Sequence, residues 1–192
     1  MSLKRTLQNE RGILTLDFVF ASMLVFGFSA ILFSFAMTFS IVEVVQYISF
    51  ASARNYSLAH LNTDRQRERA QLKFEELSTN PVLTPMITSG WFAILPAQIS
   101  DFNDEYSPST DSDIFVGVRI PFSAPILYKR IPLIGTTGNS PDGFQANINS
   151  FLAREPTFIE CRDFIQQRAA QLTSLGYAFD PSSVRIIMDN GC

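Results

Sequence analysis

The longest apolar run in the chain lies near its amino end and has the length of a membrane-spanning helix. From Phe18 to Val42 the sequence carries no charged residue and is rich in phenylalanine. A helix rises about 1.5 Å per residue, so this run reaches roughly 37 Å, whereas a bilayer core is about 30 Å thick. A secretory signal peptide has an apolar stretch of only about 7 to 15 residues. The pattern therefore predicts a retained membrane helix.

Beyond this run, polar residues interrupt the apolar positions, which is typical of a helix that emerges into water while it still covers other parts of the chain. The stretch Asn62 to Gln66 offers a capping box in which Thr63 caps a helix and Gln66 reaches back. The apolar spacing that follows predicts a second helix from about Asp64 to Leu77, or one kinked helix.

From Val82 onward, prolines and turn residues divide the chain into short elements. We expect a short strand around residues 91–95 and a longer one over residues 114–122, where β-branched and aromatic residues are dense. Pro121 marks the end of that longer strand. Residues 101–113 carry many carboxylates with serine and proline, which predicts a loop.

The last part of the chain predicts one helix and one strand. Thr157 precedes an apolar stripe that includes Cys161 and ends at Gly176, which is the pattern of a capped helix. Residues 184–188 predict a strand just before the carboxyl terminus. The fold class that follows is α+β: a long amino-terminal helix and a small domain built on a mixed sheet.

Composition and charge exclude several classes of function. Apolar residues make up 46% of the chain and charged residues 17%, with a mean hydropathy of +0.13, so part of the protein is not in water. The net charge of −3 argues against nucleic-acid binding. One histidine, His60, and two cysteines are too few for a zinc or copper site within one chain. We find no phosphate loop and no catalytic pair, and expect no enzyme and no cofactor.

The acidic loop at residues 101–113 raises the separate question of calcium. A calcium loop requires Asp or Asn at alternate positions followed by Gly, and Tyr106 stands where that Gly belongs. A solvated acidic loop is the favoured interpretation, with calcium binding as the alternative.

The charges that flank the apolar run predict its orientation. Lys4, Arg5 and Arg11 precede the run, whereas the first charges after it are Glu43 and Arg54. Because cytoplasmic flanks collect Lys and Arg, the amino end is expected in the cytoplasm. The rest of the chain, with both cysteines, is then exported to the oxidising side of the membrane.

The segment before the run carries a specific motif. Residues 9–18 read Asn-Glu-Arg-Gly-Ile-Leu-Thr-Leu-Asp-Phe, a short basic leader that ends in Gly12 and is followed by a single carboxylate, Asp17. This segment resembles the type IV pilin superfamily. The resemblance implies that a prepilin peptidase cuts between Gly12 and Ile13. It also implies that Asp17, in place of the usual Glu, pairs with the amino terminus of a neighbouring subunit.

A second segment is similar to a subgroup of that superfamily. The stretches 118–122, 125–127 and 131–135 form an alternating strand followed by a proline-punctuated apolar segment. They look like the body of TadE-like minor pilins of the tight adherence (Tad or Flp) pilus. The resemblance implies a structural subunit that assembles through its amino-terminal helix.

The two cysteines, Cys161 and Cys192, suggest a disulfide bond that anchors the carboxyl terminus. Such a bond agrees with the pilin resemblance. The alternatives are two free thiols, or a bond from Cys192 to a partner chain.

These observations divide the chain into a leader, a membrane and assembly helix, a helical stalk and an exported α+β domain, at residues 1–12, 13–50, 51–80 and 81–192. The function expected is that of a minor pilin or pilin-like subunit of a type IV or Tad pilus. The alternatives are a pseudopilin of a secretion system and a single-pass membrane sensor or adaptor with a periplasmic domain.

The resemblance also implies location and partners. The protein is expected in the bacterial inner membrane, with its domain in the periplasm or, within a pilus, outside the cell. Expected partners are the major pilin, other minor pilins, the prepilin peptidase, the inner-membrane assembly platform and membrane lipid.

Overall fold

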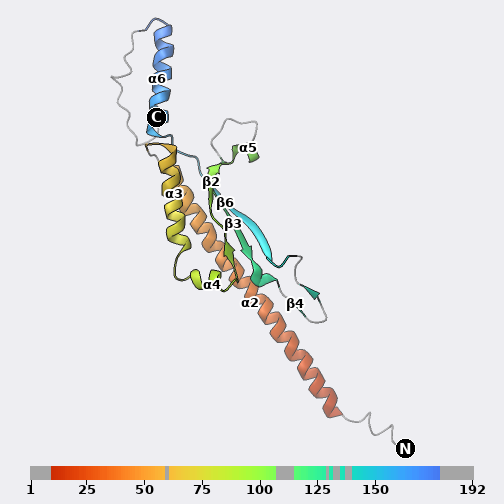
Figure 1. The fold of residues 1–192 in the computed structure, drawn as a ribbon. Helices are drawn as coiled ribbons and strands as arrows, with labels where there is room; N and C mark the ends of the chain where they lie inside the picture. The colour runs from red at the N-terminus through yellow and green to blue at the C-terminus, as the bar shows by residue number, and fades with distance from the viewer. Residues whose placement is uncertain are drawn as a thin grey trace, which may run out of the picture.

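A single helix, α2 (Glu10–Ser57), runs for 48 residues and forms the axis of the molecule (Figure 1). The computed structural model describes residues 10–58, 61–106, 115–128, 130–131, 135–136 and 140–177. No proline interrupts α2, so nothing in its sequence removes a backbone hydrogen bond or forces a kink. The apolar run and the mixed segment after it therefore form one continuous helix.

Helix α3 (Thr63–Ser78) reverses direction and packs alongside the carboxyl half of α2 (Figure 1). The prediction of a separate second helix is confirmed. The predicted cap is wrong by one residue, because the Asn62 side chain accepts a hydrogen bond from the Arg65 backbone N–H at 3.0 Å. Asparagine is one of the best capping residues. This arrangement leaves the Gln66 side chain available for contacts elsewhere.

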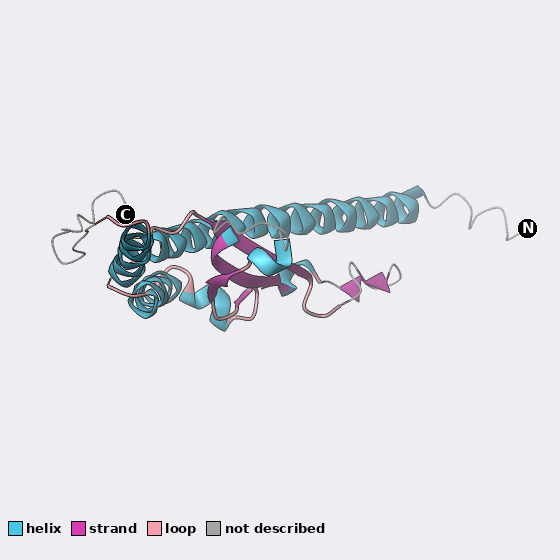
Figure 2. Cartoon of the chain, turned by 90° about the horizontal axis from the view of Figure 1, so that it is seen from above, coloured by secondary structure: helices cyan, strands magenta, loops and turns pink. Residues whose placement is uncertain are grey.

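One sheet lies against the carboxyl half of α2 (Figures 1 and 2). Its strands are β1 (Ala93–Ile94), β2 (Gln98–Asp101), β3 (Val116–Ala124) and β6 (Phe144–Phe151). Strand β3 is central: β1 and β2 pair along one edge and β6 along the other, with Ile120 opposite Ile148. Every described pairing is antiparallel. The predicted mixed sheet is thus an antiparallel one.

Two features of the sheet differ from the sequence prediction. Strand β6 was missed because Asn147 and Asn149, with low strand propensity, interrupt its alternation. Strand β3 also continues past Pro121, which was expected to end it. The Pro121 carbonyl accepts a hydrogen bond from the Leu95 N–H at 3.0 Å, where the β1 ladder ends. The missing proline N–H points to that same side, so the ladder with β6 is unaffected.

The remaining elements are short, with one exception. They are α4 (Thr84–Thr88), α5 (Asn103–Tyr106), the 3-10 turn η2 (Pro125–Leu127), the paired strands β4 (Arg130–Ile131) and β5 (Gly135–Thr136), and α6 (Phe158–Ser174). Helix α6 confirms its prediction: Thr157 and Glu160 form a capping box. Gly176, just past its end, has a φ of 87°, which favours glycine.

The core lies between α2 and the inner face of the sheet. Its buried apolar residues come from α2, α3, the α4 and β1 region, β3 and η2: Ile41, Val45, Ile48, Ala53, Phe74, Leu83, Phe92, Val118, Ile120, Phe122, Ala124 and Ile126. Two buried serines, Ser49 and Ser52, lie on the same face of α2. The Ser49 hydroxyl donates to the Val118 carbonyl at 3.3 Å, so these small side chains allow strand β3 to approach the helix closely.

The α+β class is therefore confirmed, with a long apolar helix and a small antiparallel sheet. Several predicted features lie outside the described residues: His60, residues 107–113 of the loop predicted at 101–113, the strand at 184–188, and Cys192. The described part of that predicted loop instead contains the end of β2 and helix α5, which starts where the Asp101 carboxylate accepts a hydrogen bond from the Asn103 N–H.

Gly117 provides a test of the β3–β6 pairing. A Cβ atom at this buried position would overlap the Ser150 carbonyl oxygen of β6. We expect Gly117→Ala to lower the free energy of unfolding by about 1–3 kcal/mol, because backbone must shift to admit the methyl group. Thermal unfolding in detergent, followed by circular dichroism, measures the change. Gly27→Ala is the matched control, since nothing lies within 4 Å of a Cβ there. Equal melting temperatures for the two variants would contradict this register.

Candidate functional site: the exposed faces of helix α2

Helix α2 has two halves with different surroundings. Its amino half extends beyond the four-stranded sheet and α3 (Figures 1 and 2), and the described side chains from Thr15 to Phe33 are exposed or half-buried. The large apolar side chains here are exposed: Leu16, Phe18, Val19, Phe20, Met23, Leu24, Val25, Phe26, Phe28, Leu32 and Phe33. An apolar surface of this length in water is energetically unfavourable, so these side chains require a membrane or other protein around them.

From Thr15 onward, where burial is described, Ser34 is the first buried residue of α2, and the covered half of the helix begins there. The Ser34 hydroxyl donates to the Ala30 carbonyl at 2.9 Å, and Thr38 donates to the Ser34 carbonyl at 2.8 Å. Both side chains satisfy their hydrogen bonds within the helix, so they are buried without an unpaired polar group. From Ser34 to Tyr56 one face of α2 is then buried at every turn.

The face of α2 opposite the sheet stays exposed along this covered half. Phe39 is 66% exposed, Tyr47 62% and Phe50 45%. Glu43 and Arg54 are exposed on the same face, and neither side chain has an ion-pair or hydrogen-bond partner within the described part of the chain. This outward face therefore carries exposed aromatic side chains and two opposite charges that have no partner within the described residues.

The predicted processing and pairing residues lie at the amino end of α2. Gly12 and Ile13 fall within the first turns of the helix, and Asp17 lies about one turn later, with its side chain exposed. Ile13 and Asp17 are spaced by one helical turn, so they lie on one face of the helix. A carboxylate at the edge of an apolar span is costly unless it is paired, and this makes Asp17 a functional candidate.

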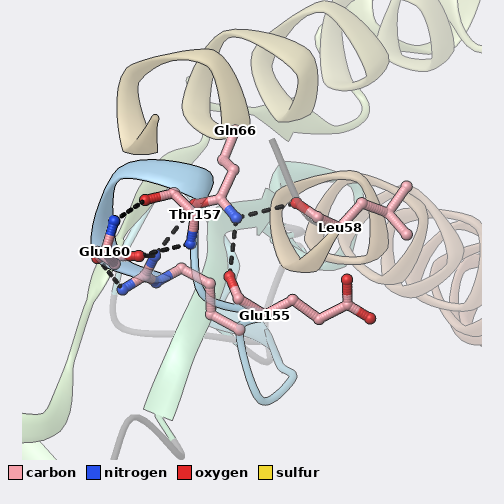
Figure 3. Close-up of polar contacts among 6 residues, drawn as sticks. Leu58, Gln66, Glu155, Thr157 and Glu160 are labelled. Carbon is pink, nitrogen blue, oxygen red and sulfur yellow. Dashed lines mark hydrogen bonds and ion pairs between the residues drawn. The ribbon is translucent and has the colours of Figure 1, made fainter. Parts of the chain in front are cut away.

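A second group of polar residues, at the far end of α2, was not predicted from the sequence. Gln66 of α3 is fully buried (Figure 3). Its side-chain amide donates to the Leu58 carbonyl at 2.9 Å and to the Glu155 carbonyl at 3.0 Å, and its oxygen accepts from Arg154 at 3.2 Å. One side chain thus joins the end of α2, helix α3 and the segment that leads into α6.

Glu160 completes this junction, the place where the end of α2, helix α3 and the segment that leads into α6 meet. Arg154 donates two hydrogen bonds to the Glu160 carboxylate, both at 2.9 Å, and the Thr157 N–H donates a third at 2.7 Å (Figure 3). The hydrogen bonds from Arg154 are the main reason that the pKa of Glu160 falls to about 2. Since α6 projects beyond the end of α2 (Figure 1), these contacts determine where it begins.

Cys161 lies in the first turn of α6 and is fully buried beside this junction. Its proposed partner, Cys192, lies outside the described residues. The disulfide therefore stays a prediction.

The outer face of the sheet carries a third group, in which Arg119 lies among aromatic rings. Its guanidinium is 4.4 Å from the centre of the Phe102 ring, and it donates to Glu105 at 2.8 Å and to the Tyr106 hydroxyl at 3.0 Å. Phe115 and Phe151 pack against Tyr106. These contacts hold helix α5 against the sheet, which is a structural role.

Among the described residues, no three His, Cys, Asp or Glu side chains are grouped closely enough to hold a metal ion. One described helix, α2 from Thr15 to Ser57, is long and apolar enough to cross a membrane. No family model, no curated protein and no solved structure matches this chain. The architecture is pilin-like. A long apolar amino-terminal helix packs by its carboxyl half against a small antiparallel sheet.

Gln66 offers a direct test of the junction. We expect Gln66→Leu to lower the free energy of unfolding by about 1–3 kcal/mol, because two carbonyls and Arg154 lose a buried partner. Gln71→Leu, at a half-buried position of the same helix where the side-chain amide bonds Glu75 at the surface, should change it by about 0.5 kcal/mol or less. Thermal unfolding in detergent compares the two. If both variants melt like the wild type, the junction does not stabilise the fold.

Proposed function

We propose that this protein is a minor pilin or pilin-like structural subunit, which assembles through α2 into a type IV or Tad pilus. The observation that carries the proposal is the division of α2. One continuous helix is bare and apolar along its amino half, whereas its own domain covers a single face of its carboxyl half. Such a helix can be anchored in a bilayer first and packed among other helices later.

The length of the bare half supports the membrane stage. From Ile13 to Phe33 there are about 21 residues, which as a helix span about 31 Å, close to the bilayer core of about 30 Å. Buried positions on α2 begin at Ser34, and its contacts with the core begin at Met37 and Ile41. We therefore place the hydrocarbon boundary near Ser34, closer to the amino end than Val42, where the apolar run ends. The domain then stands on the membrane surface.

The exposed faces of α2 support the assembly stage. In lipid, helices associate by close packing and polar contacts, because the surrounding lipid is as apolar as the side chains. Gly27 has open space around its Cα, so a neighbouring helix can approach closely there. Asp17 supplies a charge that a neighbour's amino-terminal ammonium group can neutralise.

The proposal includes orientation and partners. The amino end is cytoplasmic, where a prepilin peptidase removes the leader, and the domain faces the periplasm. The partners are the major pilin and other minor pilins, the inner-membrane assembly platform and lipid. A pseudopilin of a secretion system would use the same helix for the same kind of assembly.

Processing distinguishes a pilin from an uncut membrane sensor. Co-expression with a matched, active prepilin peptidase should yield a chain that begins at Ile13, and mass spectrometry detects this. We expect Gly12→Val to block the cut, because a branched side chain crowds the cleaved bond. Gly27→Val is the matched control and should be cut normally, since it leaves the cleavage site unchanged. An unshortened wild-type chain would overturn the proposal.

Asp17 tests assembly separately from membrane insertion. Asp17→Ala should insert normally, because loss of a charge makes burial in lipid easier. The same variant should enter sheared filaments about tenfold less than the wild type, since the neighbour's ammonium group loses its partner. Asp17→Glu retains the charge and should restore incorporation. Quantitative immunoblots of membrane and filament fractions measure both effects. Normal incorporation of the alanine variant would eliminate the pairing role.

A further inference from the structure

The outward face of α2, opposite the sheet, has a repeat that the fold itself does not use. Phe28, Phe39 and Phe50 follow one another at intervals of about 11 residues, and all three are exposed. About 11 residues make three helical turns, so these rings lie almost in one line along the helix. Glu43 and Arg54 are separated by the same interval on the same face.

This common interval makes the face complementary to a displaced copy of itself. Two parallel helices offset by about 16 Å, which is three turns, place Phe39 of one level with Phe50 of the other. The same offset places Phe28 level with Phe39, and Glu43 level with Arg54. At equal height, by contrast, Glu43 would face Glu43 and Arg54 would face Arg54, which is unfavourable.

We propose that the outward face of α2 binds the same face of a second copy of this chain with this three-turn stagger, and that Glu43 of one copy pairs with Arg54 of the next. The inference rests on the proposed function, since copies that assemble through α2 into one filament lie parallel. A second copy is the occupant because one displacement satisfies both the rings and the charges.

The stagger also determines the kind of assembly. The copy that meets Arg54 is displaced toward the carboxyl end of the helix, and the copy that meets Glu43 toward its amino end. The contact is therefore heterologous and does not close on itself. A symmetric dimer at one height in the membrane would leave both charges facing their like.

Cross-linking in assembled material tests the stagger. Two tagged copies, one with Glu43→Cys and one with Arg54→Cys, are produced together with the assembly proteins, and filaments are treated with a short bis-maleimide. We expect mixed dimers in which mass spectrometry joins position 43 to position 54, and no dimers that join 43 to 43. The chain without added cysteine is the control for the native thiols.

Charge exchange provides the second measurement. Glu43→Arg should lower incorporation into filaments about tenfold, and addition of Arg54→Glu in the same chain should restore it to about the wild-type level. Asp163→Arg reverses an exposed carboxylate of α6, away from this face, and should leave incorporation unchanged.

The outcomes separate the inference from the proposed function. Filaments that contain the wild-type protein but yield 43-to-43 links, no links, or links only to a different subunit would overturn the stagger and leave the proposed function standing. If the chain is processed but Arg54→Glu does not restore the incorporation of the Glu43→Arg variant into filaments, the pairing is also overturned. A wild-type chain that is neither cut nor incorporated would overturn both.

Discussion

The structure depends on one continuous helix, α2, whose amino half is exposed, whereas its carboxyl half is buried on one face and exposed on the other. Helix α2 is continuous over 48 residues, so the direction of each side chain is determined by its position along the helix. One face of its carboxyl half is buried from Ser34 onward. The other faces of α2 stay exposed, and the rest of the fold is arranged around that division.

Three hydroxyl side chains on this buried face form hydrogen bonds within the protein. Ser34 and Thr38 bond to carbonyls within the helix, and Ser49 bonds to strand β3. These hydroxyl side chains share the buried face with the larger core residues Ile41, Val45 and Ile48, so the helix packs closely against the sheet on this side. At the far end, Gln66 and Glu160 tie the chain segments together, so that α6 starts from a rigid position.

Elements with a strong local pattern were predictable, and those that depend on tertiary contacts were not. The apolar run, the second helix and the capped helix after Thr157 follow from periodicity and capping, which are local properties. Strand β6 was missed because its stability comes from pairing with β3, not from its own asparagine-rich sequence. The burial of Gln66 was likewise hidden, since its partners Leu58 and Glu155 are brought together only by the fold. The motif singles out Asp17, whose pairing role stays a prediction, whereas the start of the covered half at Ser34 required the structure.

The central claim is that lipid surrounds α2 only along its bare half. Spin labels at Phe26→Cys and Tyr47→Cys, in protein reconstituted into bilayers, test it through their accessibility to oxygen, which concentrates in lipid, and to a water-soluble nickel reagent. We expect the label at position 26 to be accessible to oxygen and protected from nickel, and the label at position 47 to be accessible to nickel. Nickel access at position 26 would show that the bare half is not in the membrane. Oxygen access without nickel access at position 47 would show that lipid extends along the sheet-covered half, and either result would contradict the account.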